Sequence, residues 1–292
     1  MNNTVTMNNT KTGLVLEGGA MRGMFTAGVL DVFMENGISF PDCIGVSAGA
    51  AFGCNLKSNQ PGRVLRYNLK YCREPKFCSF RSLITTGDLY GAKFCYHEIP
   101  EELDLFDVRA FDENPMGFYV VASDAETGKP HYQRIDSVDE NCYEWIRASA
   151  SMPLVSRIVE VEGGKYLDGG ITDSIPLRFM EGLHEKNVVV LTRPRDYRKK
   201  PISHPWLYRQ SLKKYPNLFK AVKNRYKMYN EQRRYVFLRE KAGKAFIICP
   251  EKPLDIGKTE HDGEKIKSAY ETGRQAALKR LDEIKRFIVD DN

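Results

Sequence analysis

The chain has 292 residues, of which 42% are hydrophobic and 28% are charged. This length suits one large α/β domain or two small ones, and the composition supports a sizeable core and excludes wholesale disorder. No run approaches the roughly 18 consecutive apolar residues of a transmembrane helix. The polar segment 1–12 lacks the apolar centre of a secretory signal. We therefore expect a cytoplasmic protein with a disordered leader at 1–12.

The positive charge is concentrated in one segment. The formal net charge is +6, yet residues 193–241 hold 16 Lys or Arg and only three acidic residues, together with nine aromatic residues. Cations mixed with amphipathic rings suit a membrane interface with anionic head groups, and no nucleic-acid recognition motif accompanies them. We hypothesise that residues 193–241 contact an anionic membrane peripherally. The alternative is a solvated helix whose aromatic residues pack on the domain.

The cysteine pattern indicates neither a disulfide framework nor a metal site. The seven cysteines are an odd number and include no C-x-x-C pair. Reduced thiols in a cytoplasmic protein account for this pattern. We expect no metal and no organic cofactor.

The first fifty residues predict a β-α-β-α unit. An apolar run at 13–17 is followed by apolar residues at helical spacing up to Asn36. A second short strand at 43–46 then leads into a helix of small residues that begins at Ser47. Such units imply a parallel sheet with right-handed crossovers.

Further elements continue this α/β pattern. Residues 61–115 are expected to form helices and loops that cover the sheet, and an amphipathic helix is expected from about Tyr215 onward, between two strands. Strands are expected at 118–123, 131–135, 157–161, 165–167, 188–192 and 245–249, and helices at 139–149, 177–185 and 263–287.

A G-x-S-x-G sequence lies between the second strand and the helix that follows it. Gly45 and Gly49 allow a sharp turn that exposes the hydroxyl of Ser47 at a helix N-terminus. Free backbone N–H groups and the helix dipole favour developing negative charge there. This pattern predicts a nucleophilic serine, and a plain tight turn is the alternative.

A glycine-rich loop follows the first strand and predicts an oxyanion hole. It is neither a Walker A loop nor a G-x-G-x-x-G sequence, because Ala20 stands where the latter needs glycine. Only 29 residues separate Gly18 from Ser47, so the loop and the serine lie on adjacent β-α units. An α/β-hydrolase places them two strands apart, which argues against that fold. The loop comprises Gly18, Gly19, Ala20, Met21, Arg22 and Gly23.

Asp168 is the better candidate for the base that activates the serine. It ends a strand, and Gly169 and Gly170 permit a tight turn after it. The alternatives are a structural Asx turn at Asp168 and a Ser–Asp–His arrangement that uses His261, the best placed of five histidines.

These three features together resemble the patatin-like phospholipase family, over roughly residues 13–195, and segment 148–154 also looks like the family's sequence before its aspartate. The resemblance implies a three-layer α/β/α sandwich with a mainly parallel sheet, and a Ser–Asp dyad without a catalytic histidine. Ser47 is then the nucleophile and Asp168 its base. Family members usually open the loop with Asp and carry three glycines, whereas this chain has Glu17 and Ala20.

We predict a serine lipid acyl hydrolase that cleaves fatty acyl esters of lipids or phospholipids through an acyl-enzyme. The alternatives are an esterase or thioesterase on small soluble esters, and a catalytically silent patatin-like module that binds lipid or protein. The patatin-like catalytic domain is expected at 13–195. Residues 196–292 are expected to add a basic helical insertion, the last strand and a C-terminal helix to the same domain.

Overall fold

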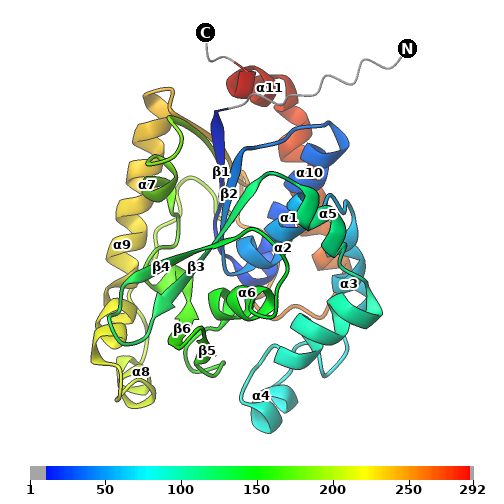
Figure 1. Ribbon diagram of the computed structural model, residues 1–292. Helices are drawn as coiled ribbons and strands as arrows, with labels where there is room; N and C mark the ends of the chain where they lie inside the picture. The colour runs from blue at the N-terminus through cyan, green and yellow to red at the C-terminus, as the bar shows by residue number, and fades with distance from the viewer. Residues whose placement is uncertain (1–10, 290–292) are drawn as a thin grey trace.

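A computed structural model describes residues 11–289 of the chain (Figure 1). One eight-stranded sheet carries helices on both faces, which confirms the predicted three-layer α/β/α architecture. Hydrogen-bonded neighbours run β5-β6-β3-β2-β1-β7-β8, and β4 pairs with β3. The strands are β1 (Thr12–Leu16), β2 (Asp42–Val46), β3 (Gly117–Asp124), β4 (Pro130–Ile135), β5 (Val159–Val161), β6 (Gly164–Asp168), β7 (Lys186–Val190) and β8 (Ala245–Ile248).

The helices connect these strands and cover the sheet. The segment 61–115 contains four of them, including the π-helix η2, and so it is largely helical as expected. The helices are η1 (Ala20–Arg22), α1 (Gly23–Glu35), α2 (Ala48–Lys57), α3 (Arg63–Tyr71), α4 (Phe80–Thr86), η2 (Phe94–Leu103), α5 (Val108–Glu113), α6 (Cys142–Ala150), η3 (Gly169–Ile171), α7 (Leu177–Met180), α8 (Pro205–Ser211), α9 (Pro216–Lys241), α10 (Gly263–Lys279) and α11 (Leu281–Val289).

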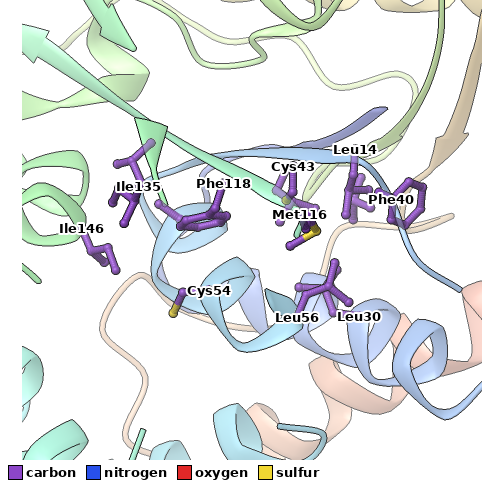
Figure 2. Packing of buried hydrophobic residues seen from close by; sticks show 14 of the residues in the cluster. Leu14, Leu30, Phe40, Cys43, Cys54, Leu56, Met116, Phe118, Ile135 and Ile146 are labelled. Atoms are coloured by element: carbon purple, nitrogen blue, oxygen red, sulfur yellow. The ribbon is translucent and has the colours of Figure 1, made fainter. Parts of the chain in front are cut away.

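Alternating side chains of the central strands pack into two hydrophobic clusters, one on each face of the sheet. Leu14 and Leu16 of β1 pack with α1, α2 and α6 on one face, and Figure 2 shows part of this cluster. Val15, between them, packs with α7 and α9 on the other face. Successive residues of a strand point to opposite faces, so an uninterrupted apolar run is what a strand covered on both sides requires.

Two strands share one edge of β3. Ala122 and Ser123 pair with both β4 and β6, which therefore lie on opposite edges of β3. The earlier β3 residues pair with both β4 and β2, so β2 and β6 lie on the same edge. β6 runs antiparallel to β3 and β2 runs parallel to it. The two strands therefore meet end to end, with their carboxyl ends facing each other.

The C-terminal third of the chain belongs to the same layers. The insertion α8–α9 lies between β7 and β8, as predicted, and β8 extends the sheet beyond β7. Helix α10 packs on α1 on the face opposite α9 (Figure 1). The contact is close because a methyl group on Gly273 would lie 1.9 Å from the carbonyl oxygen of Phe25. Glycine at this crossing lets the two helix backbones touch.

Three expectations about helices are wrong. The helix expected at 263–287 breaks between α10 and α11, where Arg280 donates to the carbonyl of Ile247 and covers the ring of Phe246. The helix expected at 177–185 is the single turn α7. The helix expected from residue 139 begins at Cys142, because the carboxylate of Asp139 accepts hydrogen bonds from two following amides.

The remaining strand and helix predictions are right to within one or two residues at most ends. Thr12, which the sequence assigned to the leader, is the first residue of β1. The rest of the predicted leader, residues 1–10, lies outside the described residues.

Replacing Gly273 by alanine should lower the free energy of unfolding by about 1–3 kcal/mol, because the new methyl group forces α10 away from α1. Gly263→Ala is the matched control in the same helix, since its methyl group would meet Leu69 at an ordinary 3.5 Å. Urea denaturation measures both. Equal midpoints for the two variants would contradict the close helix contact.

Candidate active site

Ser47 occupies a strained turn between β2 and α2. Its backbone has φ 55° and ψ −121°, a conformation that L-residues rarely adopt. Its amide donates to Ser149 Oγ at 2.8 Å. The turn is tight because methyl groups on Gly45 and Gly49 would each lie 2.5 Å from a backbone oxygen. These two glycines allow the chain to reverse within a few residues and place Ser47 at the N-terminus of α2.

Asp168 lies where β6 meets β2. It pairs with Ala122, whereas Val46 pairs with the preceding residue, Val121. Consecutive strand residues are about 3.3 Å apart, so the ends of β2 and β6 abut. Ser47 follows Val46 directly, and the structure thus brings together the two residues predicted as nucleophile and base. A methyl group on Gly169 would lie 2.0 Å from the carbonyl oxygen of Val121, so the chain after Asp168 also turns tightly against β3.

The backbone and carboxylate of Asp168 are held by nearby groups. The side chain is buried and accepts a hydrogen bond from the Gly170 amide at 2.7 Å. The carbonyl of Asp168 accepts from Ser123 Oγ at 2.7 Å. Arg225 of α9 places a guanidinium nitrogen 3.8 Å from the Asp168 carboxylate. The carboxylate therefore has a fixed orientation and a positive neighbour.

The segment after α6 links the two residues. The hydroxyl of Ser149 accepts a hydrogen bond from the amide of Ser47. The carbonyl of Ser151 accepts a hydrogen bond from the amide of Asp168 at 2.7 Å. Both residues lie in segment 148–154, which the sequence had singled out only through the family resemblance. Its role depends on contacts between positions about 17 and 102 residues apart, which no local pattern encodes.

The loop from Gly18 to Gly23 runs beside Ser47. A methyl group on Gly18 would lie 2.9 Å from Ser47 Cβ, which shows how closely the loop approaches the serine. Within residues 11–289 no hydrogen bond engages the amides of Gly18 and Gly19. Ala20 has φ 48°, so this position does require the left-handed backbone conformation. A side chain there costs roughly 1–2 kcal/mol, and alanine is a strained replacement for the usual glycine.

An apolar pocket opens beside Ser47. Its volume is about 120 Å³. Met21 of the loop lines it, as the sequence suggested, whereas Phe25 and Phe33 lie in the core. Most of the other walls come from the helices between β2 and β3 and from α6. They include Phe52, Tyr67, Phe77, Tyr90, Tyr96, Ile99, Phe106, Ile146 and Met152.

Residues 14–180, more than half of the chain, match the family described as "Patatin-like phospholipase". The chain belongs to the patatin-like phospholipase family. Residues 215–289 match a second family, described as a domain of unknown function, DUF6363.

The chain is also similar to two curated proteins and to one solved structure. The chain is 32% identical to "Uncharacterized protein YjjU" of Escherichia coli K12 over 257 residues, which cover 84% of this chain and 70% of that protein. It is 24% identical to "Patatin-like phospholipase domain-containing protein ZK370.4" of Caenorhabditis elegans over 61% of this chain and 13% of that protein. The crystal structure of VipD from Legionella pneumophila aligns with a TM-score of 0.46 and 14% identity, covering 93% of this chain and 67% of that one.

Three histidines of the patatin-like chain, His131, His184 and His261, make their contacts away from Ser47 and Asp168. His261 Nδ1 donates a hydrogen bond to the carbonyl of Cys72, and the ring does not line the pocket. His184 bonds to Asp42, the first residue of β2, at the opposite end of the strand from Ser47. His131 stacks on Trp145. The structure therefore brings none of these three rings to the serine.

Glu17, which precedes the glycine loop, is buried and fully engaged. Its carboxylate accepts the amide of Thr192 at 2.6 Å and the hydroxyl of Tyr229 at 2.5 Å. Burial and the neighbouring Glu17 raise the pKa of Tyr229, so this hydroxyl stays protonated and keeps donating. Glu17 thereby ties the loop to α9, which belongs to the DUF6363 match. Glu17 stands where family members usually have aspartate, and these contacts give it a structural role in this chain.

None of the helices in residues 11–289 is both long and apolar enough to cross a bilayer.

Lys199 is a cation near the site whose pKa is lowered. Its ammonium lies 4.5 Å from the centre of the Tyr229 ring. Burial, together with the nearby Arg225, Arg22 and Arg193, lowers the pKa of Lys199 to about 7, while Glu17 acts in the opposite direction. Lys199 is thus held among positive groups, where its charge is costly.

The lowered pKa of Lys199 predicts a pH-dependent stability. An unfolded lysine titrates near pH 10.4, so between about pH 7 and pH 10.4 the unfolded chain binds more protons than the folded one. The contribution of Lys199 to the free energy of unfolding therefore rises with pH between about pH 7 and pH 10.4. Lys199→Met should raise the free energy of unfolding, with the largest gain below pH 7 and the smallest above pH 10.

Urea denaturation at pH 6 and pH 9.5 measures this difference. Lys200→Met is the matched control, because Lys200 is the exposed neighbour. The assignment fails if Lys199→Met and Lys200→Met have the same midpoints at both pH values.

Proposed function

We propose that this protein is a serine lipid acyl hydrolase in which Ser47 is the nucleophile and Asp168 is its base. The observation that carries the proposal is the end-to-end meeting of β2 and β6, which brings Ser47 to Asp168 beside an apolar pocket. Membership of the patatin-like phospholipase family supports the same class of substrate.

The reaction needs one proton acceptor and one nucleophile. Asp168 accepts the hydroxyl proton of Ser47, and Ser47 Oγ attacks the ester carbonyl. The proton then passes to the leaving alcohol, and an acyl-enzyme remains on Ser47. Water activated by Asp168 releases the fatty acid and restores the serine. The N-terminus of α2 at Ser47 favours the negative charge that develops in both steps.

The loop Gly18–Gly23 supplies the oxyanion hole in this proposal. The amide of Ser47 is already used by Ser149, whereas those of Gly18 and Gly19 have no partner within the described residues. One such donor typically contributes about 2.7–4 kcal/mol to the transition state. The strained backbone at Ala20 then lets the loop keep these amides directed at the substrate oxygen.

The pocket volume favours a second candidate, an esterase for short acyl chains. About 120 Å³ is close to the ~150 Å³ of a cavity that binds benzene, so the pocket holds only the carbons nearest the ester. Turnover of a series of esters from acetyl to palmitoyl separates the two. A lipid hydrolase keeps or gains kcat/KM with chain length, whereas a short-chain esterase loses it after a few carbons.

Wild-type protein should be labelled covalently by a fluorophosphonate probe, and Ser47→Ala should abolish the labelling. Asp168→Asn should slow it by at least about 100-fold, because the amide cannot accept the hydroxyl proton. Gel fluorescence after timed reaction measures both rates.

Matched controls lie on the same elements. Ser58 caps the other end of α2, and Asp173 is a second buried carboxyl just after Asp168, so Ser58→Ala and Asp173→Asn should label like wild type. His261→Ala should also label normally, whereas its loss would favour the Ser–Asp–His alternative. A folded wild-type protein that takes no label would indicate a silent binding module.

We further propose that α8 docks the enzyme on anionic membranes. Most aromatic residues of 193–241 are at least half-buried, but Trp206 and Leu207 of α8 are 64% and 39% exposed. Arg209, Lys213 and Lys214 beside them are exposed cations. Helix α8 lies at the same end of the molecule as the β5–β6 hairpin, which extends beyond the carboxyl end of β2 (Figure 1). Apolar rings with nearby cations suit a lipid interface.

Replacing Trp206 and Leu207 by serine should reduce co-sedimentation with phosphatidylglycerol vesicles several-fold. Leu183→Ser is the control, since Leu183 is 48% exposed and lies just before β7, away from α8. Added salt should weaken the wild-type interaction because the cations contribute. Equal binding to phosphatidylcholine vesicles, or no effect of the double substitution, would sink the docking proposal.

A further inference from the structure

Helix α9 presents three polar side chains to the candidate active site along one face. Arg225, Tyr229 and Gln232 stand at positions i, i+4 and i+7, a spacing that places them on the same side of an α-helix. Tyr229 is buried, and the other two are half-buried. The whole helix lies within the segment that matches DUF6363, the domain of unknown function. A role for α9 at the site is therefore also a role for part of that domain.

Arg225 acts on one oxygen of the Asp168 carboxylate. Its guanidinium lies 3.8 Å from Oδ1, the same oxygen that accepts the hydrogen bond of the Gly170 amide at 2.7 Å. The other oxygen, Oδ2, makes no hydrogen bond with any residue of 11–289. Because opposite charges attract, Arg225 and Gly170 together hold Oδ1 and leave Oδ2 available to accept a proton.

Tyr229 acts on the glycine loop through Glu17. Its hydroxyl donates to Glu17 Oε1 at 2.5 Å, and the Thr192 amide donates to Oε2 at 2.6 Å. Both oxygens of this buried carboxylate are thus bonded directly before Gly18. Since a buried carboxylate is costly without its donors, these bonds fix the start of the loop relative to α9.

Gln232 holds the chain that follows the base. Its side-chain oxygen accepts the amides of Ser174 and Ile175, both at 3.1 Å, and its side-chain nitrogen donates to Asp173 at 2.6 Å. This segment continues from the turn at Asp168. One helix therefore contacts the base, the chain after the base and the residue that opens the glycine loop.

We propose that α9 is the positioning element of the hydrolase site, with Arg225 as a positioning residue for Asp168 and Tyr229 as one for the glycine loop. Arg225 keeps Oδ2 of Asp168 directed at the Ser47 hydroxyl, and Tyr229 keeps the loop amides directed at the ester oxygen. Both act through another residue, so their loss slows the chemical step more than it weakens substrate binding. This assignment rests on the proposed hydrolase function, but the contact of α9 with the loop can be tested without it.

Hydrolysis of p-nitrophenyl butyrate separates positioning from substrate binding. Arg225→Gln should lower kcat by about tenfold to 100-fold and keep KM within about twofold of wild type, because a misdirected carboxylate slows the reaction and not the binding. Arg225→Lys restores the positive charge and should recover most of kcat. Arg234→Gln, at an exposed arginine of the same helix, should match wild type.

Guanidinium ions give a second test of Arg225. The side chain is 30% exposed, so the space that Arg225→Ala leaves is open to solvent. Guanidinium chloride, well below the concentration that unfolds the protein, should raise the kcat of Arg225→Ala several-fold over sodium chloride of equal ionic strength. A purely structural role would leave Arg225→Lys and the treated Arg225→Ala as slow as Arg225→Gln.

Hydrogen–deuterium exchange tests Tyr229 without any substrate. Tyr229→Phe removes the hydroxyl that binds Glu17, so the hydrogen-bonded amides of Arg22 and Gly23 should exchange several-fold faster. Its kcat should fall about tenfold or more as the loop amides lose their direction. Tyr226→Phe is the matched control, because the Tyr226 hydroxyl makes no hydrogen bond within residues 11–289. Unchanged exchange in β3 verifies that both variants are folded.

The outcomes separate the two proposals. Faster loop exchange in Tyr229→Phe, in a protein that hydrolyses no ester and takes no fluorophosphonate label, supports the role of α9 and contradicts the hydrolase function. Wild-type kcat in Arg225→Gln and Tyr229→Phe overturns the positioning role and leaves the hydrolase function standing. A raised KM at wild-type kcat assigns Arg225 to substrate binding and also overturns it. Unchanged loop exchange in Tyr229→Phe overturns the contact of α9 with the loop, whatever the activity.

Discussion

Two strand ends that meet on one edge of β3 are the constraint on which the candidate site depends. β2 arrives parallel to β3 and β6 arrives antiparallel to it, and their last residues pair with neighbouring positions. Neither strand can continue along β3, because the end of the other strand occupies the next position. Both must turn away at once, and the residues at the two turns are Ser47 and Asp168. The same geometry that stops the strands therefore brings the serine turn next to the aspartate turn.

Turns this sharp are maintained by the rigid structure around them. Ser47 and Ala20 both have positive φ, which is unfavourable for residues with side chains. The sheet beneath them is buried on both faces, and segment 148–154 holds the amides of Ser47 and Asp168 in place. Strain at such positions persists only where surrounding contacts leave the chain no alternative. Strained residues that adjoin a pocket are consistent with a site shaped for binding and reaction rather than for stability.

Local patterns were sufficient to predict the first half of this arrangement. Apolar periodicity and glycine positions predicted the strands and helices around Gly18 and Ser47, because these signals are short-range. They could not show that Asp168 meets Ser47, since that depends on both strands pairing with β3, far away in the chain. The residues that form the pocket walls could not be predicted from local patterns either. The π-helix η2 contains Pro100 and has no simple periodicity. The sequence of 61–115 therefore did not indicate which of its residues line the pocket. The break at Arg280 likewise depends on a tertiary contact with β8.

The basic segment 193–241 does not form one uniform surface in the structure. Residues 193–241 appeared as one charged surface, but the structure divides them. Trp206 and the cations of α8 face solvent, whereas Lys199 and Arg225 turn toward Glu17 and Asp168. The Arg225 side chain is 30% exposed and lies 3.8 Å from the Asp168 carboxylate. Its charge therefore acts on the candidate site and is not only solvated, as the charge of a surface cation is. Arg225 and Tyr229 of α9 thus contact Asp168 and Glu17, so the C-terminal part of the chain contributes to the candidate site that the first half begins.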